Sequence, residues 1–260
     1  MRQRIGLVGA VIVGVFSGFA VADPRPVTFS NDTYPMGKGD WEYEQWITFS
    51  GEAEDNASAK AFVFRHEFEF GVADNFDLAI YFPEWAIEKD DDDWDTEFEG
   101  GSLEAIVYLS NPVTDFVGIG LYGEIGVGED ELEFEQKLLV QKDIGNWIFL
   151  YNLVIETELE HVFEKDEETE VEGVLEHTFG VSYAIASGWL LGGELIIASE
   201  YEDWEEYEGT TAYAGPVISY QGGQIGEEGG WWVTVTPTIQ ITNKDEEPDL
   251  VARMLFGISF

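Results

Sequence analysis

The feature that most constrains this chain is a strict alternation of apolar and polar residues in runs of ten or more. In residues 60–72, four phenylalanines and His66 occupy every second position, while Arg65, Glu67 and Glu69 fill positions between them. Successive side chains of a β-strand point to opposite faces, so this period of two predicts a strand with one apolar and one charged face.

The same period predicts about twelve strands from residue 40 onward. They are expected at 40–50, 60–72, 76–85, 102–110, 115–128, 132–142, 147–160, 171–185, 189–201, 210–221, 231–241 and 250–260. A soluble β-sandwich also alternates in this way, but its strands are typically five or six residues long. The predicted strands instead match the roughly 9–11 tilted residues that cross a bilayer. The pattern therefore favours an all-β, transmembrane, antiparallel up-and-down barrel.

The connectors support this architecture. Short neutral turns at 73–75, 111–114, 143–146 and 186–188 alternate with long acidic loops at 51–60, 88–100, 161–170 and 202–209. This asymmetry is typical of antiparallel strands in a membrane barrel, and an even strand number puts both termini on the short-turn side. Two connectors fit less well, because 128–131 is short and 222–230 is long for their positions.

Aromatic residues are predicted to form a girdle at the short-turn end, as at a membrane interface. They begin or end the expected strands: Trp41, Phe76, Tyr108, Phe116, Trp147, Tyr183, Trp189, Tyr220, Trp231 and Phe260.

Residues 1–22 read as a cleaved signal peptide, with a basic start, an apolar run and a small-x-small site; a membrane anchor is the rival interpretation. We then expect a periplasmic segment at 23–39 and the barrel at 40–260. The formal net charge of −41 argues against a nucleic-acid partner, because phosphates would be repelled. The chain has no cysteine, and no cofactor is expected.

The terminal segment ARMLFGISF, 252–260, keeps the alternation to its last residue. It predicts a spanning strand whose outward residues are Ala252, Met254, Phe256, Ile258 and Phe260. Here the chain resembles the Gram-negative outer-membrane β-barrel proteins, whose last strand ends in an aromatic residue, usually Phe. The motifs EYEQWITF, FRHEFEFGVADNFDLAIY and AGPVISY are also similar to those of porin-like barrels. The resemblance implies location in the outer membrane, lipid contact, and recognition by periplasmic chaperones and the barrel assembly machinery. The implied assembly signal consists of Met254, Phe256, Ile258 and Phe260.

The inward side of the predicted strands is rich in carboxylates. The expected lumen-lining residues are Glu42, Glu44, Arg65, Glu67, Glu69, Glu104, Glu124, Glu135, Lys137, Glu156, Glu176, Glu194, Glu200 and Arg253. Buried charges must be paired or hydrated, and three bases cannot pair so many acids. A narrow, hydrated, cation-preferring channel for ions or small solutes is one hypothesis. A sealed structural barrel whose acidic loops bind divalent cations or other ligands is the alternative.

A lipid-modifying enzyme is a second alternative, since His66 and His177 fall on outward faces. However, no G-x-S-x-G or similar motif surrounds a serine, so no catalytic residue is predicted and we do not expect an enzyme. His66, His161 and His177 are scattered, and the acidic run 90–95 lacks the glycine of a calcium loop, so no metal site is predicted.

Overall fold

The computed structural model describes residues 24–51, 60–90, 93–163, 168–223, 229–245 and 247–260. The strands are β1 Trp41–Gly51, β2 Lys60–Ala73, β3 Phe76–Asp90, β4 Asp93–Ser110, β5 Gly118–Val127, β6 Leu132–Ile144, β7 Trp147–Glu160, β8 Glu170–Ala186, β9 Trp189–Glu202, β10 Glu206–Gln221, β11 Gly230–Gln240 and β12 Leu250–Ser259. The predicted signal peptide lies outside the described residues, as do most of the 51–60 loop and parts of the connectors at 161–170 and 222–230. In the described part of the chain, no helix has the length and apolar character to cross a membrane.

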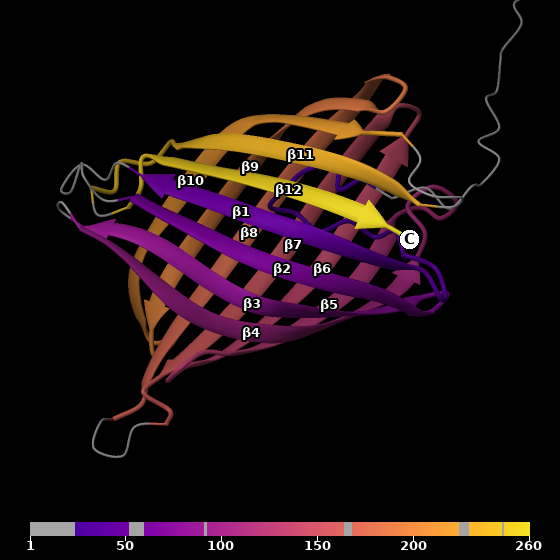
Figure 1. Cartoon of the computed structure of the whole chain (residues 1–260). Coiled ribbons are helices and arrows are strands. Elements are labelled where there is room, and N and C mark those ends of the chain that lie inside the picture. Colours follow the sequence, from indigo (N-terminus) through magenta and orange to yellow (C-terminus); the bar gives the residue numbers. More distant parts are fainter. Residues whose placement is uncertain (1–23, 52–59, 91–92, 164–167, 224–228, 246) are drawn as a thin grey trace, which may run out of the picture.

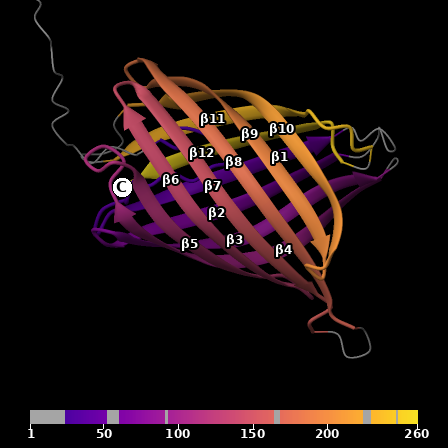
Figure 2. The ribbon, with the colours of Figure 1, turned by 180° about the vertical axis from the view of Figure 1, so that it is seen from behind.

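The strands form one closed antiparallel barrel. Each strand pairs with its neighbours in sequence, and β1 pairs with β12. Figure 1 shows β12 lying beside β1, and Figure 2 shows the opposite wall from behind. All of β12 finds partners on β1, from Gly51–Leu250 to Glu42–Ser259. Closure removes the unpaired backbone groups of an edge strand, which lipid would not tolerate. The prediction of a closed barrel of about twelve strands is confirmed.

The wall is apolar outside and polar inside. The outward Phe70, Ile80 and Leu103 are 41%, 48% and 55% exposed, whereas the inward Glu69 and Glu104 are 9% and 1% exposed. A soluble β-protein would bury the apolar set instead. This inverted distribution is the one expected for a barrel whose outer band faces lipid.

Aromatic pairs line the end of the barrel at which β12 finishes. Trp41 stacks on Phe260 with ring centroids 4.1 Å apart, and the Phe260 N–H donates to the Trp41 carbonyl at 3.0 Å. Neighbouring strands repeat the arrangement in the pairs Trp147–Tyr183, Trp189–Tyr220 and Tyr220–Trp231. We call this the girdle end and the opposite end the loop end.

Two residues expected in the girdle lie elsewhere. Tyr108 is inward-facing and buried, packed with Tyr122 and Leu139, because it shares the inward side of β4 with Glu104. Phe116 precedes β5 in a turn that runs from 111 to 117, longer than the predicted 111–114.

Two expected long loops are largely strand. Residues 88–90 belong to β3 and residues 93–100 to β4, with Lys89 opposite Trp94. The alternation persists through this acidic stretch, and Phe98 packs edge-on against Phe82 at 6.1 Å. The strand period, not the charge, thus decides the backbone conformation here.

Residues 206–209 likewise belong to β10, and only residues 203–205 form a tight turn. Asp203 and Trp204 have φ of 50° and 59°, and the Glu205 N–H donates to the Glu202 carbonyl at 3.0 Å. Two successive positive φ values characterise the hairpin turn that matches strand twist. The sequence analysis predicted a long loop here because residues 202–209 are mostly acidic.

The largest correction concerns the segment expected at 23–39 on the periplasmic side. Residues 24–36, which we call the plug segment, lie inside the barrel, where Val27 and Thr33 have no exposed surface. Figure 1 shows this part of the chain as an indigo trace within the wall. The segment supplies hydrogen-bond donors to inward carboxylate and amide side chains. The sequence analysis instead expected water or cations to compensate the inward charges.

Candidate functional site in the barrel lumen

The plug segment begins with a buried arginine that joins two wall carboxylates. The Arg25 Nε lies 3.1 Å from Glu44 Oε1, and its Nη2 lies 3.4 Å from Glu67 Oε2. The Arg25 carbonyl accepts hydrogen bonds from Thr234 and Ser219, at 2.6 and 3.4 Å. The guanidinium therefore bridges β1 and β2, while the carbonyl is held by β10 and β11.

The middle of the plug segment is anchored on Glu194 of β9. This carboxylate accepts the backbone N–H groups of Thr28, Phe29 and Ser30, at 2.9, 2.9 and 3.1 Å. The Thr236 hydroxyl donates to the same carboxylate at 2.9 Å. Hydrogen bonds to a charged acceptor are stronger than neutral ones, so Glu194 is the main polar anchor of the segment.

Amide side chains of the wall continue the contact toward the girdle end. The Asn31 N–H donates to Asn152 Oδ1 and the Thr33 N–H to Gln141 Oε1, each at 2.6 Å. Beyond them, Met36 N–H donates to Asp77 Oδ2 at 2.9 Å. The segment thus crosses the interior from β1 to β3 by way of β9, β7 and β6.

The wall itself carries two neighbouring rows of glutamates, set by the strand register. Residues of one row lie directly opposite one another across successive strands. The first row contains Glu42, Glu69, Glu104, Glu124, Glu135, Glu156 and Glu200, interrupted only by Ala79 and Val174. The second contains Glu44, Glu67, Glu133, Glu158, Glu172, Glu202 and Glu206, interrupted by Tyr81, Ser102 and Gly126.

We call these two rows the acidic ribbon. Glu42 is the second residue of β1, at the girdle end, and Glu202 is the last residue of β9, at the loop end. Because barrel strands tilt, a row perpendicular to them climbs the wall as it passes from strand to strand. The ribbon therefore reaches from one end of the interior to the other.

At the girdle end the ribbon is buried, and most of its carboxylates have hydrogen-bond partners. Glu42 accepts from the Trp232 indole at 2.7 Å, and Glu44 from the Trp46 indole at 2.8 Å as well as from Arg25. Glu104 accepts from the Tyr81 hydroxyl at 2.6 Å.

Two further bases serve the middle of the ribbon. Arg65 is paired with Glu84 at 2.6 Å and with Glu124. Lys137 lies 2.8 Å from Glu135 and 3.2 Å from Asn31 Oδ1 of the plug segment. Arg253, by contrast, donates to Thr48 at 3.0 Å and sits 4.4 Å from the Phe29 ring centroid.

Toward the loop end, the ribbon has no such partners. Among the residues that the structure describes, no ion pair joins a Lys or Arg to Glu156, Glu158, Glu172, Glu200 or Glu202. Of these, the inward Glu156, Glu158 and Glu200 are part-exposed rather than buried.

Nine of the residues expected to line the lumen lie in the ribbon: Glu42, Glu44, Glu67, Glu69, Glu104, Glu124, Glu135, Glu156 and Glu200. Glu176 and Glu194 lie beside it on β8 and β9. The sequence interpretation missed five others, namely Glu133, Glu158, Glu172, Glu202 and Glu206. The alternation could have identified these residues, because side chains two positions apart face the same side of a strand. Glu133 is two positions from Glu135, and Glu158 is two positions from Glu156.

The outward histidines each bind a tyrosine. His66 Nδ1 lies 2.9 Å from the Tyr43 hydroxyl, and His177 Nδ1 lies 3.0 Å from the Tyr151 hydroxyl. Both pairs occupy the same place in their hairpins, on β1–β2 and β7–β8. A hydrogen bond of this kind satisfies a polar group on an apolar face.

Comparison with known proteins agrees with the barrel. A channel described as the COG4313 outer membrane channel from Pseudomonas putida F1 is similar, with a TM-score of 0.59, 10% identity, and coverage of 90% of this chain and 100% of that one. The NanC porin is also similar, with a TM-score of 0.51, 10% identity, and coverage of 84% and 98%. No curated protein matches the sequence.

These likenesses establish the fold, which is that of the porin-like outer-membrane β-barrels. A family model matches residues 20–249, a span that contains the plug segment and all but the terminal strand. The chain therefore belongs to the family described as "Family of unknown function (DUF6662)".

Proposed function

We propose that this protein is a narrow outer-membrane channel that prefers cations and carries ions or small cationic solutes. The observation that supports this most strongly is the acidic ribbon, which follows the inner wall from the girdle end to the loop end. Fixed carboxylates along a low-dielectric wall concentrate cations and exclude anions.

The register of the ribbon adds a physical reason for cation entry. Like charges directly opposite each other on neighbouring strands are destabilising. Glu133 faces Glu158, and Glu158 in turn faces Glu172, with no base of the described chain paired to them. Mobile cations, water and bound protons are what remains to compensate these charges. A layer of exchangeable cations on the wall is the starting condition for cation-selective conduction.

The similarity to solved channels is consistent with this proposal. Both the COG4313 protein and the NanC porin are described as a channel or a porin. At 10% identity, their own solutes cannot be transferred, so the selectivity argument depends on this chain's glutamates alone.

The plug segment favours a second candidate, the sealed barrel whose loops bind ligands. Its contacts reach at least six strands in the girdle-side interior. If the segment stays in place and leaves no gap beside it, the interior is closed at that end. If a gap remains beside it, or the segment moves, cations pass along the ribbon.

Planar-bilayer recording of the purified barrel in a KCl gradient separates the two candidates. We expect a small conductance whose reversal potential lies on the cation side. The double variant Glu156→Gln/Glu158→Gln should shift this potential toward zero, because it removes two charges from the loop-side ribbon without touching the plug segment. Asp74→Asn is the matched control, since this exposed acid lies in the β2–β3 turn outside the ribbon.

A reversal potential on the anion side would refute the selectivity. Absence of conductance in the wild type, together with conductance in a variant lacking residues 24–36, would establish the sealed barrel. An equal shift in Asp74→Asn and in the double variant would mean that general surface charge, rather than the ribbon, sets the potential.

A further inference from the structure

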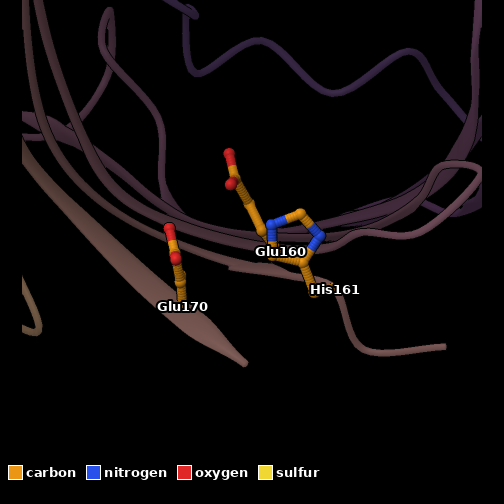
Figure 3. A group of neighbouring side chains, drawn as sticks. All are labelled: Glu160, His161 and Glu170. Atoms are coloured by element: carbon orange, nitrogen blue, oxygen red, sulfur yellow. The ribbon is translucent and has the colours of Figure 1, made fainter. Parts of the chain in front are cut away.

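Three side chains with metal-binding groups meet at the loop end of β7 and β8. Glu160 is the last residue of β7, Glu170 is the first residue of β8, and the two lie directly opposite each other. His161 follows Glu160. A carboxylate oxygen from each glutamate and an imidazole nitrogen all lie within 4.8 Å of one another. Figure 3 shows the two carboxyl groups and the imidazole ring in this arrangement.

The backbone fixes the histidine in this position. His161 has a φ of 58°, in the left-handed region, so the chain turns sharply where β7 ends. The next residue, Val162, donates its N–H to the Asp130 carbonyl at 2.9 Å. Asp130 belongs to the β5–β6 connector, and its Oδ2 lies 3.4 Å from His161 Nδ1. A second hairpin thus supports the group and brings a further carboxylate next to the imidazole.

The chemistry of this group points to a cation. Glu160 and Glu170 would repel each other as directly opposed like charges, and a bound cation removes that cost. Donor atoms that bind one ion at about 2.0–2.2 Å lie within a few ångströms of one another. The donor atoms of this group, all within 4.8 Å of one another, are close to that spacing. Calcium and magnesium take all-oxygen sites, whereas an imidazole nitrogen selects transition metals and zinc.

We propose that Glu160, His161 and Glu170 bind a divalent ion of the zinc class at the outer mouth of the barrel, with Asp130 orienting the imidazole. The sequence interpretation predicted no metal site because His161 stands alone in the sequence and Glu170 lies across a connector. Only the pairing of β7 with β8 brings them together. Binding at this mouth requires no open lumen, so the inference does not depend on conduction.

Calorimetric titration of the folded barrel in detergent with ZnCl₂, near neutral pH and at fixed ionic strength, tests the site. We expect one saturable zinc event per chain that persists at high salt. His161→Asn should weaken it by at least about tenfold, since loss of even an outer-shell metal partner typically costs 10–100-fold. Asparagine is the suitable replacement because it tolerates the left-handed backbone and removes the imidazole. Heat-modifiable migration in gels verifies that each variant is folded.

Two controls separate this site from general acidity. Glu202→Gln alters another directly opposed rim pair, Glu202–Glu206, which has no histidine beside it, and should leave zinc affinity unchanged. His177→Asn removes an imidazole elsewhere and should do the same. CaCl₂ should bind more weakly than zinc and should be insensitive to His161→Asn.

The inference is overturned by an absence of saturable zinc binding, by equal affinity in wild type and a folded His161→Asn, or by an equal loss in Glu202→Gln. Because the measurement is binding alone, it separates this proposal from the channel. A barrel that conducts cations but ignores zinc contradicts only the metal site, and one that binds zinc but does not conduct contradicts only the channel.

Discussion

The girdle-side and loop-side halves of the lumen compensate glutamates of the same ribbon in different ways. In the girdle-side half, Glu44 and Glu67 are buried and bound to Arg25 of the plug segment. In the loop-side half, Glu156 and Glu158 are part-exposed and have no paired base among the described residues. Both halves derive their acids from one strand pattern, so the difference comes from the groups that face them. On the girdle side these are Arg25 of the plug segment and wall donors such as Trp46 and Trp232.

The comparison indicates which charges are structural and which are available for function. A buried carboxylate bound to a guanidinium is fixed, and removal of either partner leaves an uncompensated charge. A hydrated carboxylate can exchange its counter-ions and contributes little to stability. Substitutions should therefore have opposite consequences in the two halves.

The largest effect is expected from Arg25→Ala. This change leaves Glu44 and Glu67 buried without their cation, and breaking a buried ion pair typically costs about 3–5 kcal/mol. Urea unfolding of the barrel in detergent should show a loss of this order. Bilayer recordings should show a larger conductance, because the plug segment loses its first anchor.

Arg25→Lys is the matched control for charge. It keeps the cation but lacks the forked geometry by which Nε and Nη2 reach two different carboxylates, so an intermediate loss is expected. If Arg25→Ala unfolded and conducted as the wild type does, the plug segment would not neutralise the girdle-side half.

A smaller effect is expected from Glu194→Gln. The glutamine cannot accept three N–H groups on a charged carboxylate, and its NH₂ group would face donors. Hydrogen bonds to charged groups contribute about 1.5–3 kcal/mol, so a loss in that range should accompany faster hydrogen exchange at Thr28, Phe29 and Ser30. Glu176→Gln on neighbouring β8 is the control and should change neither quantity. Unchanged exchange in Glu194→Gln would mean that other contacts hold the segment.

Thr234→Val should cost less, about 0.5–1.5 kcal/mol for each neutral hydrogen bond lost. It removes the bonds of the hydroxyl to the Arg25 carbonyl and to Ser219 Oγ while keeping side-chain shape. Thr238→Val provides the comparison, since Thr238 donates to the Val251 carbonyl within the wall. Only Thr234→Val should accelerate amide exchange in the plug segment. Equal acceleration in both variants would indicate a general loosening of β11.

The wall was predictable because the side-chain period of a strand can be read directly from the sequence. The outward Phe70 and inward Glu69 follow from that period, and so does the closing strand β12, Leu250–Ser259. The opposition of glutamates across strands was not predictable, because register depends on pairing between distant segments. Tyr108 shows the related limit, since an aromatic residue at a strand end can face either way.

The plug segment was missed because residues 24–36 have no strand or helix period. A chemical signal was present, however. The stretch from Thr28 to Tyr34 is rich in hydroxyl and amide side chains, which are donors that a lumen with excess carboxylates requires. An imbalance between predicted buried acids and bases can therefore indicate that an unassigned polar segment lies inside.

The smallest expected effect is a gain in stability, whereas the other variants are expected to lose stability. Glu158 faces Glu133 on one side and Glu172 on the other, so Glu158→Gln removes two like-charge contacts. Cross-strand pairs contribute roughly 0.2–1 kcal/mol, so this variant should be more stable than the wild type by up to about 1 kcal/mol at low ionic strength. Salt screens charges in contact with water, so the gain should disappear in urea titrations at high salt.

Glu44→Gln, the matching change in the girdle-side half, should destabilise the barrel because it deprives Arg25 of a partner. If both variants destabilised the barrel, Glu158 would be bound as tightly as Glu44, and the two halves of the ribbon would be compensated in the same way.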